Sequence, residues 1–445
     1  MANPDGSTED KNLLSSWKEI SAYLGRDVRT CLRWERKFGL PIHRLDPKSD
    51  KSRVFAYREE LDRWLHQSKT GRSRGRNYSP RILFVGGLCL AVAALAFVLR
   101  VFFLGRFFLG QPADFSIKGS VLAVLDNGGR VLWRYDTGLE NLCGEEIYRS
   151  RFQFRRSART ASLPYLLIKD LNRDGRHEVL FSLQTQDEMG EGVVLCFDRN
   201  GRPLWRFRAG REMKCGDKTY SGDYRIHGLL AEDLDGDGQL EIIVVSVQRP
   251  SWPCQLALLN PQGRLEGEFW NAGYFNDVCL ADLDDDGIKE IIAGGNHNES
   301  GRGCLAVFAS HSISGGSPQA TFPYRCPGLG PGSELFYILL PRTDVDLADC
   351  YPVDAIISVD ILDNRRIQAK TDLSSLFYQF TFDFREKEVI LSHGFMQAHE
   401  KARQEGRIRS RLDKEYEDRL VEGIRYWDGG QWTSEPVQNQ VREEM

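Results

Sequence analysis

The chain has 445 residues, enough for two or three domains, and its 41% hydrophobic content is that of a globular protein rather than a disordered or fibrous one. The formal net charge of -4 hides an asymmetry. Between Leu13 and Arg76 about 16 Lys and Arg stand against about 8 Asp and Glu, so this segment is basic and the remainder is acidic. A basic segment is a candidate nucleic-acid binder, whereas an acidic body suits metal ions or neutral partners.

After a tail at residues 1–12 that we expect to be disordered, the first predicted domain spans residues 13–68. The stretch "SSWKEISAYLGRDVRTCLRWERKFGLPIHR" predicts two short helices joined by a tight turn. Ser16 can cap the first helix with Glu19 three residues on, Gly25 permits the turn, and Asp27 can cap the second helix. Val28 and Cys31 are expected to face inward. Basic side chains face outward on the second helix, which is helix-turn-helix geometry with that helix presented to a major groove.

The next stretch, "HRLDPKSDKSRVFAYREELDRWL", predicts a turn-rich loop, a short strand and an amphipathic helix. With "RTCLRWERKFGLP" and "SRVFAYREELDRWL" in place, the segment resembles the MerR-type winged DNA-binding domain and its excisionase relatives. This resemblance implies base or phosphate contacts from the second helix and phosphate contacts from the wing. The candidate DNA-binding residues are Arg26, Arg29, Thr30, Arg33, Arg36, Lys37, Arg53 and Tyr57. Two alternatives stay open, namely a solvated basic face without a DNA partner and loose phosphate binding without sequence preference.

MerR-type regulators usually continue into a long dimerising helix, whereas this chain continues into a basic linker at residues 69–81. A homodimer therefore remains a hypothesis. The following stretch, "ILFVGGLCLAVAALAFVL", is an uncharged apolar run of 18 residues. At about 1.5 Å per residue it nearly spans a bilayer, and "VFFL" after Arg100 extends it, so we predict a single transmembrane helix at residues 82–104. A buried core helix is the alternative.

The orientation of this span follows from the charges on its two sides. Lys69, Arg72, Arg74, Arg76 and Arg81 precede the apolar run, whereas the far side offers mainly two arginines before the acidic domain. By the positive-inside rule, the N-terminus is cytoplasmic and the C-terminal domain lies outside the inner or plasma membrane.

Eight cysteines fall in the exported part, where disulfides can form. Four of them, Cys143, Cys215, Cys326 and Cys350, sit in polar or Pro/Gly-rich stretches and are the expected disulfide partners. No CxxC pair occurs, so a structural zinc site is not expected.

The exported domain, predicted at residues 115–445, contains internal repeats. Three stretches, "VLAVLDNGGRVLWRY", "VVLCFDRNGRPLWRF" and "LALLNPQGRLEGEFW", each read as strand, Gly-containing turn and strand. They alternate with "DLNRDGRHEVLFS", "DLDGDGQLEIIVVS" and "DLDDDGIKEIIAGG", in which an acidic loop precedes a strand. The repeat length of roughly 50 to 70 residues is that of a β-propeller blade. Near the C-terminus the sequence predicts a charged helix and then "RYWDGGQWT" as a closing hairpin.

The acidic loops have the spacing of a calcium site. Side chains at loop positions 1, 3 and 5 can converge on one ion, the Gly at position 6 permits the bend, and the Glu at position 9 closes the shell from the strand entrance. Asx-turn chemistry without a metal is the alternative. The first loop is the weakest, since Asn172 and Arg173 reduce its negative charge. The candidate calcium ligands are Asp170, Asn172, Asp174 and Glu178; Asp233, Asp235, Asp237 and Glu241; and Asp282, Asp284, Asp286 and Glu290.

These repeats resemble the FG-GAP/VCBS repeats of integrin-like β-propellers. The resemblance implies two or three structural calcium ions rather than catalysis. The expected fold is therefore multidomain: a small α-helical winged helix-turn-helix, a single transmembrane helix and an all-β propeller of five to seven blades.

No GxSxG, HExxH or phosphate-cradling Gly motif occurs, so we do not expect an enzyme. Two function classes remain. The first is a membrane-anchored one-component transcriptional regulator whose extracytoplasmic propeller senses a ligand or partner. The second is an extracytoplasmic binding or adhesion protein whose cytoplasmic head is an anchor or is inactive.

Overall fold

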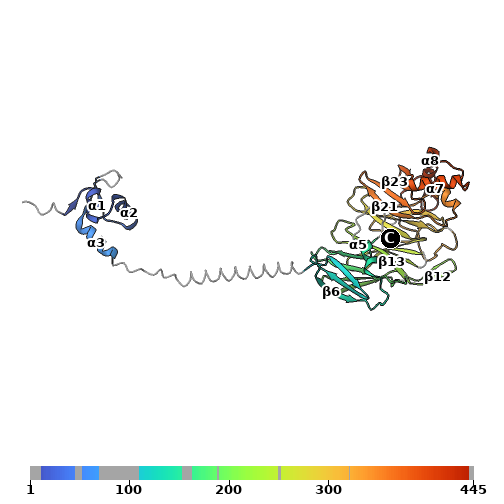
Figure 1. The fold of residues 1–445 in the computed structure, drawn as a ribbon, viewed down its shortest axis with the longest axis horizontal. Helices are drawn as coiled ribbons and strands as arrows, with labels where there is room; N and C mark the ends of the chain where they lie inside the picture. The colour runs from blue at the N-terminus through green and yellow to red at the C-terminus, as the bar shows by residue number, and fades with distance from the viewer. Residues whose placement is uncertain are drawn as a thin grey trace, which may run out of the picture. The chain divides into compact units, whose positions relative to one another are not determined.

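The structure is a computed structural model, and it divides into two compact units, Met1–Phe103 and Leu104–Met445 (Figure 1). Among the described residues, no helix is both long and apolar enough to cross a membrane. The predicted tail up to residue 11, the linker from residue 70 and the predicted span at residues 82–104 lie outside the described residues. The structure describes residues 12–45, 53–69, 110–152, 163–187, 190–248, 252–319 and 321–439.

The first unit, called the head here, folds as predicted into two short helices followed by a strand and a third helix. Ser16 caps α1 by accepting the Glu19 N–H, and Gly25 ends the helix with φ 64, a conformation that glycine adopts without strain. Glu19 accepts the N–H of Ser15, so only half of the predicted capping box forms. The elements are β1 (Leu13–Leu14), α1 (Trp17–Leu24), α2 (Val28–Phe38), β2 (His43–Arg44), β3 (Val54–Tyr57) and α3 (Arg58–Lys69), with strand order β1-β3-β2.

One small core holds these elements together. Ile20 of α1, Cys31 of α2 and Leu61 of α3 are fully buried in it, and Trp34 and Trp64 pack against it with ring centroids 5.7 Å apart. Val28, which was expected to face inward, is 38% exposed because it is the first residue of its helix and lies beyond the core.

The second unit consists mainly of antiparallel sheets that follow one another in chain order. Most are four-stranded meanders, which is the arrangement of β-propeller blades. Sheet one contains β4 (Asp114–Lys118), β5 (Val121–Leu125) and β6 (Val131–Asp136); sheet two contains β7 (Leu166–Lys169), β8 (Glu178–Ser182), β9 (Val193–Phe197) and β10 (Pro203–Arg208). Sheet three contains β13 (Tyr224–Glu232), β14 (Glu241–Gln248), β15 (Cys254–Leu259) and β16 (Leu265–Asn271).

Sheet four begins with β17 (Phe275–Ala281), β18 (Glu290–His297), β19 (Arg302–Phe308) and β20 (Phe336–Leu339), and it is extended by β25 (Arg425–Trp427) and β26 (Trp432–Thr433). Sheet five contains β21 (Ile356–Leu362), β22 (Arg366–Thr371), β23 (Phe377–Thr381) and β24 (Lys387–Ile390). The remaining elements are α5 (Glu145–Phe152), β11 (Met213–Cys215), β12 (Lys218–Tyr220), α6 (Asp344–Ala348), α7 (His393–Gln404) and α8 (Lys414–Glu422). The predicted closing hairpin is thus β25–β26, which pairs with β20, and the predicted charged helix is divided into α7 and α8.

The three predicted hairpins are confirmed as β5–β6, β9–β10 and β15–β16. In each turn, the side-chain oxygen of Asp126, Asp198 or Asn260 accepts backbone N–H groups two and four residues ahead. These Asx-turns explain why the same hairpin recurs with different flanking residues.

Hydrophobic clusters join each sheet to the next one in the chain. Separate clusters lie between sheets one and two, two and three, three and four, and four and five. The inner strands β9 and β15 of sheets two and three are buried on both faces, whereas β6 and β22 alternate between buried and more exposed residues. Sheets one and five lie at opposite ends of the unit (Figure 1), and among the described residues no hydrophobic cluster joins them.

Helix α5 protects the free edge of sheet one. Strand β4 pairs with β5 only, so its outer backbone groups need other partners. Glu145 accepts the Ile117 N–H at 2.9 Å, and Arg149 donates to the Phe115 carbonyl. Arg149 also pairs with Glu145 at 2.6 Å and with Asp114 at 2.7 Å. Side chains of α5 therefore bind backbone groups of β4 that a fourth strand would otherwise bind.

Candidate functional site

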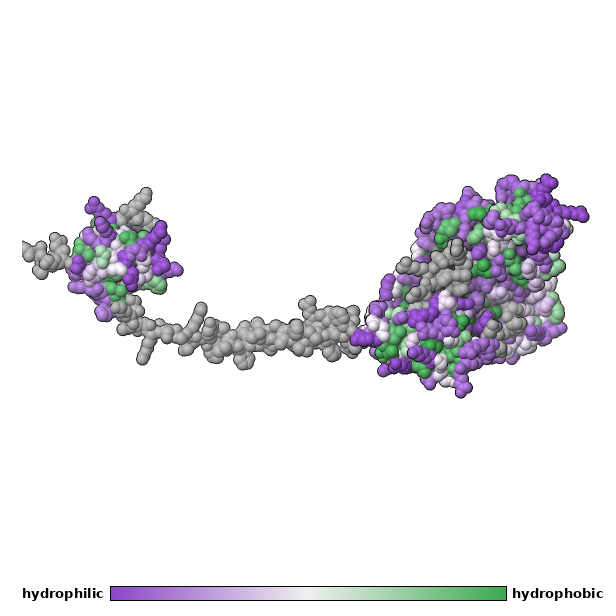
Figure 2. Space-filling model, viewed as in Figure 1, coloured by the Kyte–Doolittle hydropathy of each residue, from purple (hydrophilic) through white to green (hydrophobic). Residues whose placement is uncertain are grey.

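The first candidate site is the basic face of α2 in the head. Positions 29, 33, 36 and 37 fall within about 100° of one another on a helix of 3.6 residues per turn, so their side chains share one face. Arg26, Arg29, Arg33, Arg36 and Lys37 are all exposed. Figure 2 shows hydrophilic side chains over much of the visible surface of the head.

Thr30 differs from the other predicted DNA-binding residues. It is half-buried, its N–H donates to Asp27 at 2.9 Å, and its hydroxyl donates to the same carboxylate at 2.7 Å. The hydroxyl of Thr30, followed by backbone N–H groups, lowers the pKa of Asp27 below its usual value. The side chain of Thr30 therefore serves as part of the helix cap.

The outward cations of α2 form no ion pair with any carboxylate that the structure describes. Among the described residues, no Asp or Glu oxygen lies within ion-pair distance of Arg29, Arg33, Arg36 or Lys37. Arg44, by contrast, forms a bidentate pair with Glu35 at the back of the same helix. The outward cations are thus available to an external anion such as a phosphate.

The two candidate residues of the predicted wing lie at the two ends of β3. Arg53 is exposed just before β3, and Tyr57 is 41% exposed at the end of that strand. His43 stacks on Phe55 with ring centroids 5.3 Å apart and bonds Glu60 at 2.7 Å, which fixes β2 against β3.

The second candidate site is the series of acidic loops. They connect β7 to β8, β13 to β14 and β17 to β18, so each joins the first two strands of a sheet. Glu178, Glu241 and Glu290 are the first residues of the strands that follow, as predicted. The loops therefore occupy equivalent positions in sheets two, three and four.

Two of the three loops bring carboxylates together. Oxygens of Asp233, Asp235 and Glu241 lie within 4.8 Å of one another, and so do those of Asp282, Asp284 and Glu290. An ion about 2.4 Å from each oxygen reaches oxygens up to about 4.8 Å apart, so this donor set fits calcium.

The position-five aspartates make turn contacts instead. Asp237 accepts the Gln239 N–H at 2.6 Å, and Asp286 accepts the Ile288 N–H at 2.7 Å. In the first loop, Asp170 accepts the N–H groups of Asp174 and Gly175. Among the described residues, the candidate ligands of this loop do not bring their carboxylate oxygens together as those of the other two loops do. Asx-turn chemistry is thus present in all three loops.

The position-nine glutamates link each loop to its strand. Glu178, Glu241 and Glu290 accept the N–H of the leucine at loop position two, at 2.8–3.0 Å. Burial raises the pKa of all three carboxyls, in the case of Glu178 to about 7. A cation bound beside such a carboxyl would favour its ionised form.

Direct contacts also join each loop to the next. The Leu240 N–H donates to Leu171 O at 2.8 Å, and the Lys289 N–H donates to Leu234 O at 2.9 Å. Arg365, in the short turn between β21 and β22, forms a bidentate pair with Asp285 at 2.7 and 3.0 Å. The loops therefore connect sheets two to five along one edge.

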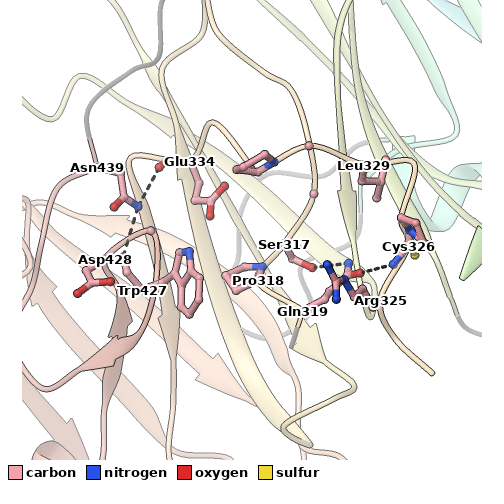
Figure 3. Close-up of a pocket in the computed structure, with 16 residues that line it drawn as sticks. Ser317, Pro318, Gln319, Arg325, Cys326, Leu329, Glu334, Trp427, Asp428 and Asn439 are labelled. Atoms are coloured by element: carbon pink, nitrogen blue, oxygen red, sulfur yellow. Dashed lines mark hydrogen bonds between the residues drawn. The ribbon is translucent and has the colours of Figure 1, made fainter. Parts of the chain in front are cut away.

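A third site, which the sequence did not reveal, is a cavity of about 500 Å³ beside sheet four (Figure 3). Its wall is the Pro/Gly-rich segment at residues 316–334, together with Trp427 and Asp428 from the β25–β26 hairpin and Asn439 near the C-terminus. A disulfide joins Cys326 of this wall to Cys215 of β11. Cys143 and Cys350, the other two expected partners, carry free thiols. The sequence pointed to this segment through Cys326, an expected disulfide partner whose pairing it left open.

Comparisons with known proteins find distantly similar solved structures but no family. No family model matches the chain, and no curated protein matches it. Solved structures that resemble it include a protein of unknown function from Bacteroides caccae, with 12% identity over 63% of this chain and 74% of that one and a TM-score of 0.29. The Dos1 propeller has 8% identity over 63% and 69% with a TM-score of 0.30, and BBS1N in complex with ARL6DN has 8% identity over 64% and 74% with a TM-score of 0.33. The assignment of propeller-type architecture rests on the successive antiparallel sheets themselves.

Proposed function

We propose that this protein is a membrane-anchored one-component transcriptional regulator. In this proposal the head binds DNA in the cytoplasm, residues 82–104 cross the membrane once, and the β unit senses a ligand or partner outside. The observation that carries the proposal is the exposed row of α2 cations on a capped helix, which form no ion pair with a described carboxylate. Cations in this arrangement suit phosphates and the acceptor edges of guanine in a major groove.

Calcium in the second and third acidic loops would have a structural role. The six convergent residues (Asp233, Asp235, Glu241, Asp282, Asp284 and Glu290) would hold the ions, and the loop contacts would transmit their effect to neighbouring sheets. Neither loop offers a nucleophile or a general base with a partner, so the proposal contains no catalytic step.

Salt-dependent DNA binding by the full-length chain tests the proposal. We expect binding at about 50 mM salt that weakens steeply by about 200 mM, because phosphate contacts release counterions. The specificity test uses DNA fragments that have been enriched by selection for binding. Competitor DNA of unrelated sequence should displace the protein from these fragments only when the competitor is in large excess. No binding at low salt would refute a regulatory role for the head.

The second candidate function, an extracytoplasmic binding protein with an anchoring head, is favoured by the cavity beside sheet four. The same DNA experiment separates the two functions, since this alternative predicts no sequence preference. A reporter fused after Asp114 tests the topology that both share and should be active only outside the cytoplasm.

A further inference from the structure

The cavity beside sheet four has walls of mixed polarity. Trp427 is half-buried, and Asp428 and Glu334 contribute carboxylates, Glu334 being only 3% exposed. Figure 3 shows these groups and Asn439 at one end, whereas Ser317, Gln319 and Arg325 lie at the other. Proline and glycine form much of the wall between them, so it presents backbone groups rather than large apolar side chains.

Existing hydrogen bonds hold several of these groups in place. Asn439 donates its amide to the carbonyls of Glu334 and Trp427, at 3.2 and 3.3 Å. Gln319 accepts the Cys326 N–H at 3.2 Å, which joins it to the disulfide-bonded wall. Asp428 accepts the N–H groups of Gly430 and Gln431 through the same oxygen, Oδ1. These contacts fix the side chains before a ligand arrives, which lowers the entropy cost of binding.

The chemistry of the lining excludes several ligand classes. Two carboxylates disfavour an anion, the Arg325 guanidinium disfavours a simple cation, and the polar wall disfavours an apolar molecule. A neutral ligand with many hydroxyl groups satisfies donors and acceptors of both kinds, and its C–H faces can pack on an indole ring. A volume of about 500 Å³ lies within the usual range for small-molecule sites.

We infer that this cavity binds a neutral carbohydrate, with Trp427 as the stacking surface and Asp428 as a hydroxyl acceptor. The inference deepens the proposed function by giving the sensed ligand a chemical class, and it rests on that function only for its biological meaning. Binding in the cavity requires neither DNA nor an active head.

Calorimetric titration of the purified full-length chain with neutral mono- and disaccharides tests the inference. We expect at least one saccharide to bind, Trp427→Ala to weaken its binding at least 10-fold, and Trp427→Phe to weaken it less. Asp428→Asn should weaken it about 5-fold, since asparagine keeps the turn-forming oxygen but loses the charge. The matched control is Asp198→Asn, which changes an equivalent Asx-turn in sheet two and should leave affinity unchanged.

Binding of no saccharide, equal binding by wild type and the Trp427 and Asp428 variants, or binding of cationic amines alone would overturn the inference. A melting temperature for Trp427→Phe close to that of wild type separates loss of the site from loss of the fold. DNA binding measured on the same preparation distinguishes the two proposals: a chain that binds a saccharide but no DNA refutes only the regulator, and the reverse result refutes only the carbohydrate site.

Discussion

The cations on α2 of the head and two arginines of the β unit have opposite surroundings. In the head, Arg29 and Arg33 are exposed and lie beyond ion-pair reach of every described carboxylate. In the β unit, Arg149 and Arg365 form paired contacts that close a sheet edge and join two turns. Among the described residues, the α2 cations therefore contribute no ion pair to their own fold, which suits the proposed contact with DNA phosphates. The difference also predicts that removing charge affects binding in one unit and stability in the other.

The largest expected effect is on DNA binding. Replacing both Arg29 and Arg33 with Ala should lower affinity at least about 30-fold, because each arginine that contacts a base contributes about 1–3 kcal/mol. The free energy of unfolding should change by less than about 0.5 kcal/mol, as is usual for exposed positions. Fluorescence anisotropy at fixed salt measures the first quantity and chemical denaturation the second. Arg63→Ala on α3 is the matched control, and equal affinity of all three proteins would contradict the comparison.

The second prediction concerns a buried carboxyl at the start of sheet five. Asp354 is 3% exposed, and burial, followed by the neighbouring charge of Asp346, raises its pKa from 3.8 to about 6. Since the folded state holds this proton more tightly than the unfolded state, stability falls as pH rises from about 4 to 6. Asp354→Asn keeps the oxygen that accepts the N–H groups of Ala355 and Leu373 but cannot ionise.

The variant should therefore match wild type at pH 4 and exceed its stability at pH 7 by up to about 3 kcal/mol. Urea denaturation at both pH values measures the difference, and subtracting wild type from variant removes the contribution of other titrating groups. A difference that does not change with pH would show that Asp354 ionises normally.

The third prediction concerns calcium. At about 100 times its dissociation constant, calcium should stabilise the β unit by about 2.7 kcal/mol per site, and a chelator should reverse the shift. Asp282→Asn combined with Asp284→Asn should remove the contribution of one site. Asp285→Asn is the control in the same loop, because this side chain pairs with Arg365 rather than with the convergent carboxylates. Identical melting curves with calcium and with chelator would favour Asx-turn chemistry alone.

The smallest expected effect is at the edge of sheet one. Arg149→Ala should cost about 2 kcal/mol, since it removes charge-assisted hydrogen bonds to Glu145, Asp114 and the Phe115 carbonyl. Arg149→Lys should recover part of this loss, because an ammonium group cannot reproduce the planar fork. Arg134→Ala, on an exposed position of β6, should change stability by less than about 0.5 kcal/mol. Thermal denaturation compares the three variants, and equal melting temperatures would show that α5 does not protect the edge.

The local features that depend on short-range chemistry could be predicted from the sequence. The Asp27 cap, the Gly25 turn and the hairpins closed by Asp126, Asp198 and Asn260 all follow from residues within a few positions of one another. The apolar run "IIVV" after Glu241 likewise indicates a strand, which the structure has as β14.

Features that depend on distant contacts could not be predicted. Helix α5 was not among the elements predicted from the sequence, and its contacts with the edge of β4 join Glu145 and Arg149 to distant residues. The sequence indicates that Asp237 and Asp286 have ligand spacing, yet their oxygens bind N–H groups two residues ahead. The cavity beside sheet four combines residues more than 100 positions apart, so no local pattern marks it. The position of Thr30 on the second helix predicts a contact with DNA, whereas the structure shows that its hydroxyl donates a hydrogen bond to Asp27.

The sharpest test of DNA binding by the head is to map the genomic DNA that the full-length chain binds in its own cells. We expect discrete sites that share a sequence and that are lost when Arg29 and Arg33 are both replaced with Ala. No enrichment above background, or the same enrichment for this variant as for wild type, would contradict this expectation.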